Sequence, residues 1–440
     1  MLKCGFAQVD ITPELGLFIP GYFSKRQADG VIDPLYARAF VADDGETVLA
    51  FVVMDIIHVS AKSTAMIRER ASKATGIPEA NIMVAATHIH TGSSTDRNSD
   101  VSPANMSNVI WTATRTADAI TEAYNNRVDA KMGYGDCLEF NVGFNRRYMM
   151  KDGTLKTNPG VLNPNVEKSA SPIDPQVGVI RVDNAEGQPI GAVVNFSVHP
   201  DVVGGTKYCA DYIGELARTM KKVYGESFGV VYMNGCCGDI NHVDVLGGTN
   251  LPRGQQHLKM GKILAGDAIA ALERTLTTDA VKLSTASTVF HGTRRRPTEA
   301  DYEWAKKTLA DPNASQVDKS YAGAWVDMFE NPIPDPDIEV QASVIKFKEL
   351  YKTGKSRGDV AICSLPGEIF VEIGLEIKKK SPFEHNIMCE LANGYYGYIS
   401  TRRGIELGGY ETRINKSTNM DKETGPQLVT NHLKLLNQLR

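Results

Sequence analysis

The stretch that organises this sequence is Asn81-Ile82-Met83-Val84-Ala85-Ala86-Thr87-His88-Ile89-His90-Thr91-Gly92, an apolar run that ends in a His-x-His pair. Residues 81–86 are mostly apolar and contain neither Gly nor Pro, which predicts a buried strand. Because side chains alternate faces along a strand, we expect His88 and His90 on one face, roughly 6–7 Å apart. Two imidazoles at a strand end suit a metal site or a proton-transfer site. A pair cannot hold a metal alone, so partners must come from elsewhere in the chain.

Apolar runs of strand length recur along the chain and alternate with amphipathic segments. The runs are residues 48–56, 81–86, 190–198, 229–233, 360–365 and 386–391. Apolar residues at helical spacing mark the segments 60–75, 105–124, 211–224 and 255–276. Strands that alternate with helices predict an α/β fold with much buried sheet.

Size and composition restrict the class of protein. The chain has 440 residues, of which 42% are hydrophobic, enough for a large core. We interpret residues 1–440 as a single domain, in which the polar region 280–350 forms a lid or an inserted subdomain. The formal net charge is −4, and no Lys/Arg cluster interleaves with aromatic residues, so nucleic-acid binding is not favoured.

Targeting signals and cysteine usage bear on location. The N-terminus lacks the apolar core of a signal peptide, and no segment approaches the ~18–20 apolar residues of a membrane helix. The seven cysteines are scattered, with only Cys236 and Cys237 adjacent, which favours reduced thiols. We therefore expect a cytoplasmic protein with a small-molecule substrate and no membrane partner. The sequence does not predict the oligomeric state.

Polar residues with metal-binding side chains follow other apolar runs. His199 ends the run 193–198, and Glu368 follows residues 363–367, which close with Pro-Gly. Each residue alone has an ordinary explanation, a hydrogen-bonded core histidine or a carboxylate in the first turn of a helix. Together with His88 and His90, they form a nitrogen and oxygen set that suits zinc with an open coordination position.

At this point the sequence resembles the catalytic domain of the neutral/alkaline (non-lysosomal) ceramidase family. The matching elements occur in family order between residue 1 and about residue 415. They are Thr87-His88-Ile89-His90-Thr91-Gly92, Asn145-Arg146, Val198-His199-Pro200, Asn234-Gly235 to Gly238-Asp239-Ile240, Pro366-Gly367-Glu368, and the tyrosine run from Asn393 to Tyr410.

The resemblance implies layered mixed β-sheets flanked by α-helices and a zinc site. The positions of the family's zinc ligands are occupied by His88, His199, Glu368 and Tyr398. Its further active-site residues correspond to His90, Arg146 and Tyr410. Tyr398 rests on the resemblance alone, because a phenol with a pKa of about 10 ligates only where its surroundings favour the phenolate.

The chain departs from the family pattern where a serine is implicated in amide cleavage. Asn241 occupies that position, followed by His242 in place of a proline, and an asparagine has no hydroxyl with which to attack. From residues 1–440 we also expect a protein without the immunoglobulin-like domain of true ceramidases and without a signal peptide. These departures argue against ceramide, an apolar lipid, as the substrate.

The resulting hypothesis is a metal-dependent hydrolase of the amidohydrolase type (EC 3.5.1), with zinc as its cofactor. Water held by zinc attacks the carbonyl of an amide in a small, polar N-acyl compound. Arg146 and Tyr410 stabilise the oxyanion, and His90 transfers the proton to the leaving group. Asn241 and His242 contact the substrate or orient the water, and Asp239 supports a ligand histidine.

Other interpretations remain open from the sequence. The same centre could cleave an ester or a lactone, or act in carbohydrate breakdown. A non-catalytic, metal-stabilised binding protein and a purely structural zinc site with four protein ligands are the further alternatives.

Overall fold

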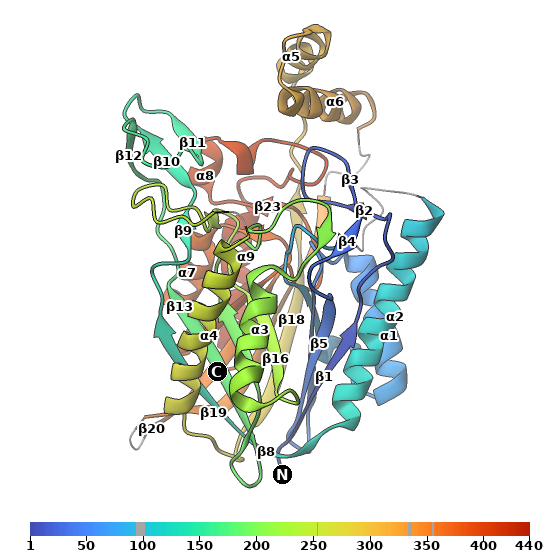
Figure 1. Cartoon of the computed structure of the whole chain (residues 1–440), viewed down its shortest axis with the longest axis vertical. Helices are drawn as coiled ribbons and strands as arrows, with labels where there is room; N and C mark the ends of the chain where they lie inside the picture. The colour runs from blue at the N-terminus through green and yellow to red at the C-terminus, as the bar shows by residue number, and fades with distance from the viewer. Residues whose placement is uncertain (94–101, 253, 333–336, 354–355) are drawn as a thin grey trace.

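A mixed sheet of eight strands forms the centre of the molecule (Figure 1). The computed structural model describes residues 1–93, 102–252, 254–332, 337–353 and 356–440. In spatial order the strands are β16 (Gly229–Asn234), β14 (Pro189–Phe196), β13 (Gln176–Asn184), β8 (Val128–Leu138), β1 (Lys3–Asp10), β5 (Tyr36–Asp43), β6 (Val48–Met54) and β7 (Ile82–Ala86). The pairs β6–β7 and β14–β16 are parallel, and the other pairs are antiparallel.

A second sheet of four strands packs against one face of the first. Its order is β18 (Lys282–Thr293), β19 (Asp337–Thr353), β20 (Ser356–Leu365) and β22 (His385–Glu390), and β20 and β22 are parallel. Phe40 and Phe51 of the first sheet stack with centroids 5.9 Å apart. Phe51 in turn stacks on Phe347 of the second sheet, with centroids 6.1 Å apart. The apolar layer between the sheets is therefore continuous.

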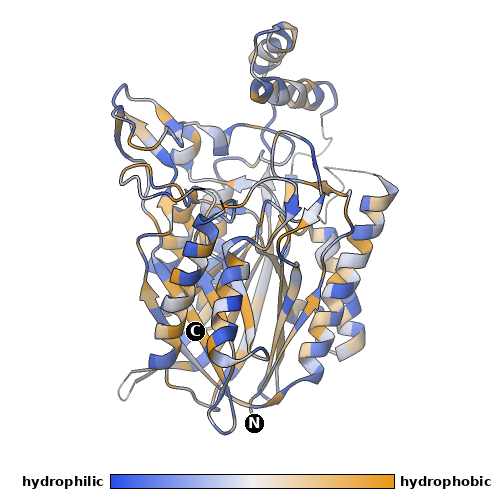
Figure 2. Ribbon diagram, viewed as in Figure 1, coloured by the Kyte–Doolittle hydropathy of each residue, from blue (hydrophilic) through white to orange (hydrophobic). Residues whose placement is uncertain are grey.

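Helices cover the outer face of each sheet, which gives four layers. The helices on the eight-stranded sheet are α1 (Ala61–Thr75), α2 (Pro103–Asn125), α3 (Asp211–Tyr224) and α4 (Gln256–Arg274). The helices on the four-stranded sheet are α7 (Val371–Lys380) and α9 (Thr424–Gln438). Helices α3 and α4 carry both blue and orange stretches in Figure 2, as amphipathic helices do. The predicted α/β class with layered mixed sheets and flanking helices is confirmed.

Both faces of the central strands are buried, which explains why their sequences are continuous apolar runs. In β6, Ala50, Val52 and Met54 belong to the core under the helices. The intervening Phe51 and Val53 belong to the core between the two sheets. Since both faces of such a strand are buried, every position is apolar and the period of two disappears from the sequence.

Short elements gather at one end of the sheets and surround the functional site (Figure 1). The short strands are β2 (Phe18–Ile19), β3 (Arg26–Gln27), β4 (Gly30–Val31), β9 (Phe144–Asn145), β10 (Arg147–Met150), β11 (Leu155–Thr157), β12 (Val166–Ser169), β15 (Lys207–Tyr208), β17 (Ile240–Asn241), β21 (Glu368–Ile369) and β23 (Tyr398–Ile399). The short helices at this end are α8 (Arg402–Glu406) and η2 (Tyr410–Thr412), whereas η1 (Glu79–Asn81) precedes β7 at the opposite end of that strand.

A pair of helices, α5 (Glu299–Ala310) and α6 (Gln316–Glu330), projects beyond this end of the sheets (Figure 1). The pair lies within the region 280–350, whose flanking parts form β18 and β19 of the second sheet. Arg413 fixes it to the body, because its guanidinium lies 4.1 Å from the ring centroid of Tyr321 and 3.0 Å from Asp318 Oδ1. The indole of Trp325 also donates a hydrogen bond to the carbonyl of Ile414, at 2.6 Å. Of the helices within the described ranges, none combines the length and apolarity needed to cross a membrane.

Candidate active site

Each of the site residues follows the carboxyl end of a strand. His88 comes two residues after β7, His199 three residues after β14, and Glu368 three residues after β20. Each of these strands belongs to a parallel pair. The loops after these three strands, which belong to two sheets, bring side chains distant in sequence to one point.

The His-x-His pair does not continue the strand, so the predicted strand geometry is wrong at this point. Strand β7 ends at Ala86, and His88 has a φ of +71°, in the left-handed region. The His88 N–H then donates to the carbonyl of Ile56, at 3.0 Å. This turn brings the rings of His88 and His90 together, with centroids 5.0 Å apart and planes nearly perpendicular. A non-glycine residue in this conformation costs about 1–3 kcal/mol and is typical of functional sites.

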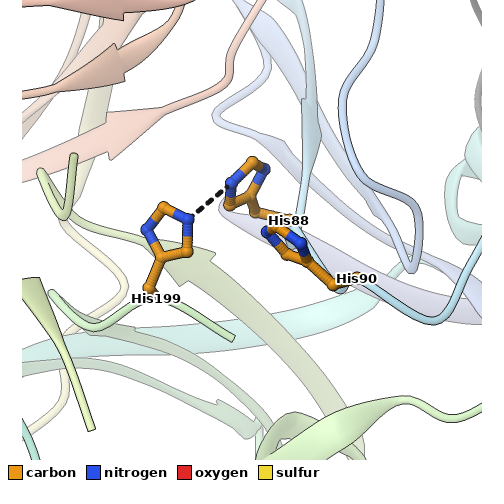
Figure 3. A group of neighbouring side chains, drawn as sticks. All are labelled: His88, His90 and His199. Atoms are coloured by element: carbon orange, nitrogen blue, oxygen red, sulfur yellow. Dashed lines mark hydrogen bonds between the residues drawn. The ribbon is translucent and has the colours of Figure 1, made fainter. Parts of the chain in front are cut away.

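A ring nitrogen of His88 faces a ring nitrogen of His199, as Figure 3 shows. His88 Nδ1 lies 2.6 Å from the carbonyl of Ile57, and His199 Nδ1 lies 3.1 Å from the carbonyl of Cys237. A carbonyl only accepts, so both Nδ1 atoms carry their hydrogens and both Nε2 atoms carry lone pairs when the rings are neutral. These two Nε2 atoms are 3.0 Å apart. They need a cation between them, either a shared proton or a metal ion.

Glu368 adds a carboxylate to the same point. Its Oε2 lies 3.3 Å from His88 Nε2 and 3.6 Å from His199 Nε2. Its Oε1 accepts a hydrogen bond from the hydroxyl of Tyr395, at 2.7 Å. Burial would raise the pKa of Glu368, but the two histidines and a hydrogen bond from Tyr398 hold it well below its usual range. Burial lowers the pKa of His88, but the Glu368 carboxylate more than offsets this, and the net shift is upward.

His90 completes a cluster of three histidines whose ring nitrogens lie within 4.8 Å of one another. It is buried, and neither of its ring nitrogens has a hydrogen-bond partner. Burial lowers the pKa of His90 to about 4, even though Asp201 Oδ1 lies 3.8 Å from Nδ1. A buried imidazole without partners is costly, so this ring fits either a ligand position or a proton-transfer position. A metal ion could therefore be held by the three histidines, or by His88, His199 and Glu368.

Tyr398 and Arg146 lie beside Glu368. Tyr398 pairs with Glu368 across the two parallel strands β21 and β23. Arg146 Nη2 donates to the Tyr398 hydroxyl at 3.0 Å and to the carbonyl of Gly238 at 2.6 Å. Burial raises the pKa of Tyr398 well above its usual value, although Arg146 opposes this. The phenol therefore stays protonated unless a further cation lies against it.

Tyr410 faces the same cavity from η2. Its ring lies 6.0 Å from that of Tyr398, and the guanidinium of Arg146 lies 5.9 Å from its centroid. The next residue, Glu411, is fully buried and accepts hydrogen bonds from Arg146 Nε and Arg147 Nη1, each at 2.9 Å. Sequence reasoning gave Glu411 no role, although two arginines at positions 146 and 147 are a signal that a buried acid is needed.

Asn241 and Asp239 have other partners than those expected. The amide of Asn241 donates to Asn158 Oδ1 at 2.9 Å and accepts from the N–H of Val243 at 3.0 Å, and Asn241 does not line the cavity. Asp239 accepts from the N–H of Val371 and the amide of Asn145, at 2.8 and 2.9 Å. The expectation that Asp239 supports a ligand histidine is therefore wrong, because backbone carbonyls occupy the Nδ1 atoms of His88 and His199.

A cavity of about 850 Å³ opens onto the histidines and extends to helix α6. We call its two parts the inner wall and the outer wall. The inner wall includes His88, His90, Glu368, Tyr395, Tyr398 and Tyr410. The outer wall includes Phe23, Arg294, Arg295, Tyr321, Asp327 and Asn331. Aromatic rings and polar groups thus alternate along the path from solvent to the histidines.

Two solved structures share this fold. The neutral ceramidase from Pseudomonas aeruginosa matches with a TM-score of 0.75 at 16% identity, over 100% of this chain and 74% of the other. A structure described as ceramidase complexed with C2 matches with a TM-score of 0.73 at 17% identity, over 100% of this chain and 75% of the other. Comparison with curated protein sequences gives no match.

The chain therefore has the fold of these two ceramidase structures, and His88, His90 and His199 form a cluster that could hold a metal ion. Residues 2–213 match the family model described as neutral/alkaline non-lysosomal ceramidase, N-terminal. The resemblance to the neutral/alkaline ceramidase family is thereby confirmed. The matched residues contain His88, His90, Arg146 and His199.

Proposed function

We propose that this chain is a zinc-dependent hydrolase that cleaves the amide bond of a small, polar N-acyl compound other than ceramide. The observation that carries the proposal is the pair of Nε2 atoms of His88 and His199, 3.0 Å apart with the Glu368 carboxylate beside them. Two neutral imidazoles and one carboxylate that meet at a point are a donor set that zinc prefers. When bound, zinc would polarise a substrate carbonyl and make a water molecule more acidic.

The assignment of ligands follows from what each side chain already contacts. We assign His88, His199 and Glu368 to the metal, because the free Nε2 atoms and Oε2 converge. Tyr398 is the fourth candidate ligand, since it pairs with Glu368 across β21 and β23. We assign His90 to proton transfer. Loss of the metal in His90→Ala would instead assign the metal to the set of three histidines.

The remaining residues bind and orient the substrate in this scheme. The phenol of Tyr410 lines the cavity and donates a hydrogen bond to the oxygen on which negative charge develops. Arg146 holds the Tyr398 hydroxyl and places its positive charge against the same region. His90, with two unpaired ring nitrogens, accepts a proton and delivers it to the leaving amine.

The cavity supports a polar substrate. Arginine, aspartate and asparagine side chains line the outer wall, so a hydrocarbon chain bound in this part of the cavity would contact them. Burying such groups against a lipid tail without hydrogen-bond partners would cost several kcal/mol. A cytoplasmic enzyme that acts on a small molecule, without nucleic-acid or membrane partners, is consistent with this lining.

The proposal is tested with matched substrates on the zinc-loaded protein. N-acyl amides, the corresponding esters and lactones are assayed with and without a chelator, and zinc is then added back. We expect turnover of amides that the chelator abolishes and zinc restores, and that is absent in His88→Ala. Turnover of esters or lactones alone would replace the amidase assignment by an esterase or lactonase. Turnover that survives the chelator and the substitution would overturn the zinc mechanism.

A further inference from the structure

Within the described parts of the chain, two arginines of the outer wall form no ion pair. Arg294 and Arg295 follow β18 and line the cavity. No carboxylate in the described parts of the chain lies within 4.0 Å of either guanidinium. Arg295 donates instead to the backbone carbonyls of Met420 and Thr412, each at 2.9 Å. Burial lowers the pKa of Arg295, and Asp421 offsets this only in part.

The two acidic residues that line the cavity are already paired. Asp327 of the outer wall pairs with Lys416, at 2.5 Å. Glu368 of the inner wall lies against His88 and His199. The outer wall therefore carries an excess of positive charge in a partly buried place, which is unfavourable unless an anion occupies it.

Among the described residues, the Arg294 guanidinium has no ion pair and no hydrogen bond. It is half-buried, and its described interaction is an electrostatic one with the phenol of Tyr396. That phenol is already engaged, because it donates to the carbonyl of Glu339, at 2.8 Å. The guanidinium of Arg294 is thus available to a ligand in the cavity.

We infer that the outer wall binds an anionic group of the substrate, a carboxylate held by Arg294 and Arg295, while the inner wall holds the scissile bond. This inference rests on the proposed function, since it specifies the substrate of the same site. A planar guanidinium matches a carboxylate with two parallel hydrogen bonds, which is the strongest recognition a side chain offers this group. The carboxylate belongs either to an N-acyl amino acid or to an acidic N-acetyl sugar, since aromatic rings that line the cavity suit both.

The kinetic test compares each acid with a neutral partner. The acids are N-acetylphenylalanine and N-acetylneuraminic acid, the partners are their methyl esters, and acetate release is measured. We expect the wild type to favour at least one acid over its ester by roughly tenfold to a hundredfold in kcat/KM. Arg294→Gln brings this ratio close to one, whereas Arg70→Gln, an exposed arginine on α1, leaves it unchanged. Equal rates for acid and ester in the wild type would overturn the inference.

A binding test separates this inference from the proposed function. His88→Ala is designed to remove the metal, so a carboxylate can no longer bind there. Calorimetry with the same two acids then reports on the outer wall alone. An acid that binds His88→Ala but not the double variant His88→Ala/Arg294→Gln supports the inference. If such binding is seen but the wild type releases no acetate, the proposed function fails and the inference stands. Binding of neither acid, or equal binding of acid and ester, would overturn the inference while the zinc mechanism could stand.

Discussion

Glu411 is the residue whose loss should cost most outside the apolar core. Its carboxylate is fully buried and bonded to Arg146 Nε and Arg147 Nη1, both at 2.9 Å, and to the hydroxyl of Thr157 at 3.0 Å. The two arginine side chains are only 8% and 1% exposed, so water cannot replace the carboxylate. Removing one partner of a buried ion pair typically costs about 3–5 kcal/mol. Glu411→Gln keeps one acceptor oxygen, so we expect a loss of about 3 kcal/mol in the free energy of unfolding.

The assay is equilibrium unfolding in denaturant, followed by two probes to establish a single transition. The matched control is Glu423→Gln, which breaks an ion pair with Arg402 at the exposed surface and should change stability little. Because Glu411 also positions Arg146 and adjoins Tyr410, activity should fall in Glu411→Gln but not in the control. Equal stability losses in the two variants would refute the reasoning, because burial is the main difference between them.

Three further predictions concern other parts of the chain. Burial raises the pKa of Asp211 to about 7, above the ~3.9 of an unfolded chain. The stabilising contribution of Asp211 is therefore complete below pH ~4 and decreases as the pH rises to about 7. Denaturation at several pH values should show the wild type losing stability relative to Asp211→Asn over this range only. Gly397 has a φ of +68° and a Cβ there would lie 2.1 Å from the carbonyl oxygen of Ser417. Gly397→Ala should therefore cost several times the ~1 kcal/mol expected for Gly408→Ala, whose φ is +71° with open space around it, and similar melting temperatures would contradict this. His90→Ala should retain the metal and lower kcat by roughly 10²–10⁴-fold; loss of the metal would assign His90 to the ligand set.

The layers of the fold could be predicted because burial produces a local pattern of apolar residues in the sequence. A strand such as β6, with one face under the helices and one between the sheets, is apolar at every position. The convergence of His88, His199 and Glu368 was also predictable, because each follows such a strand. Polar residues just after buried strands lie at the ends of the sheets, where loops from distant parts of the chain can meet.

Other features depend on contacts that no local pattern encodes. The turn at His88 contains no glycine at the position of positive φ. Its conformation goes with the hydrogen bond from the His88 N–H to the carbonyl of Ile56. Glu390 is the last residue of β22, and its carboxylate accepts the N–H groups of Cys237, in a loop, and of Ile369, in β21. A single acid inside an apolar run indicates burial but not its partners. The motif that contains Asn241 predicted that its side chain contacts the substrate. In the structure, both the nitrogen and the oxygen of its amide form hydrogen bonds within the protein.

The metal content of the purified protein tests the central claim most directly. The protein is incubated with zinc, freed of excess metal by gel filtration, and analysed by elemental mass spectrometry together with His88→Ala and His291→Ala, an exposed histidine on β18. We predict about one zinc per chain in the wild type and in His291→Ala, and almost none in folded His88→Ala. A wild type without bound zinc, or a His88→Ala variant that still holds one equivalent, would contradict the account.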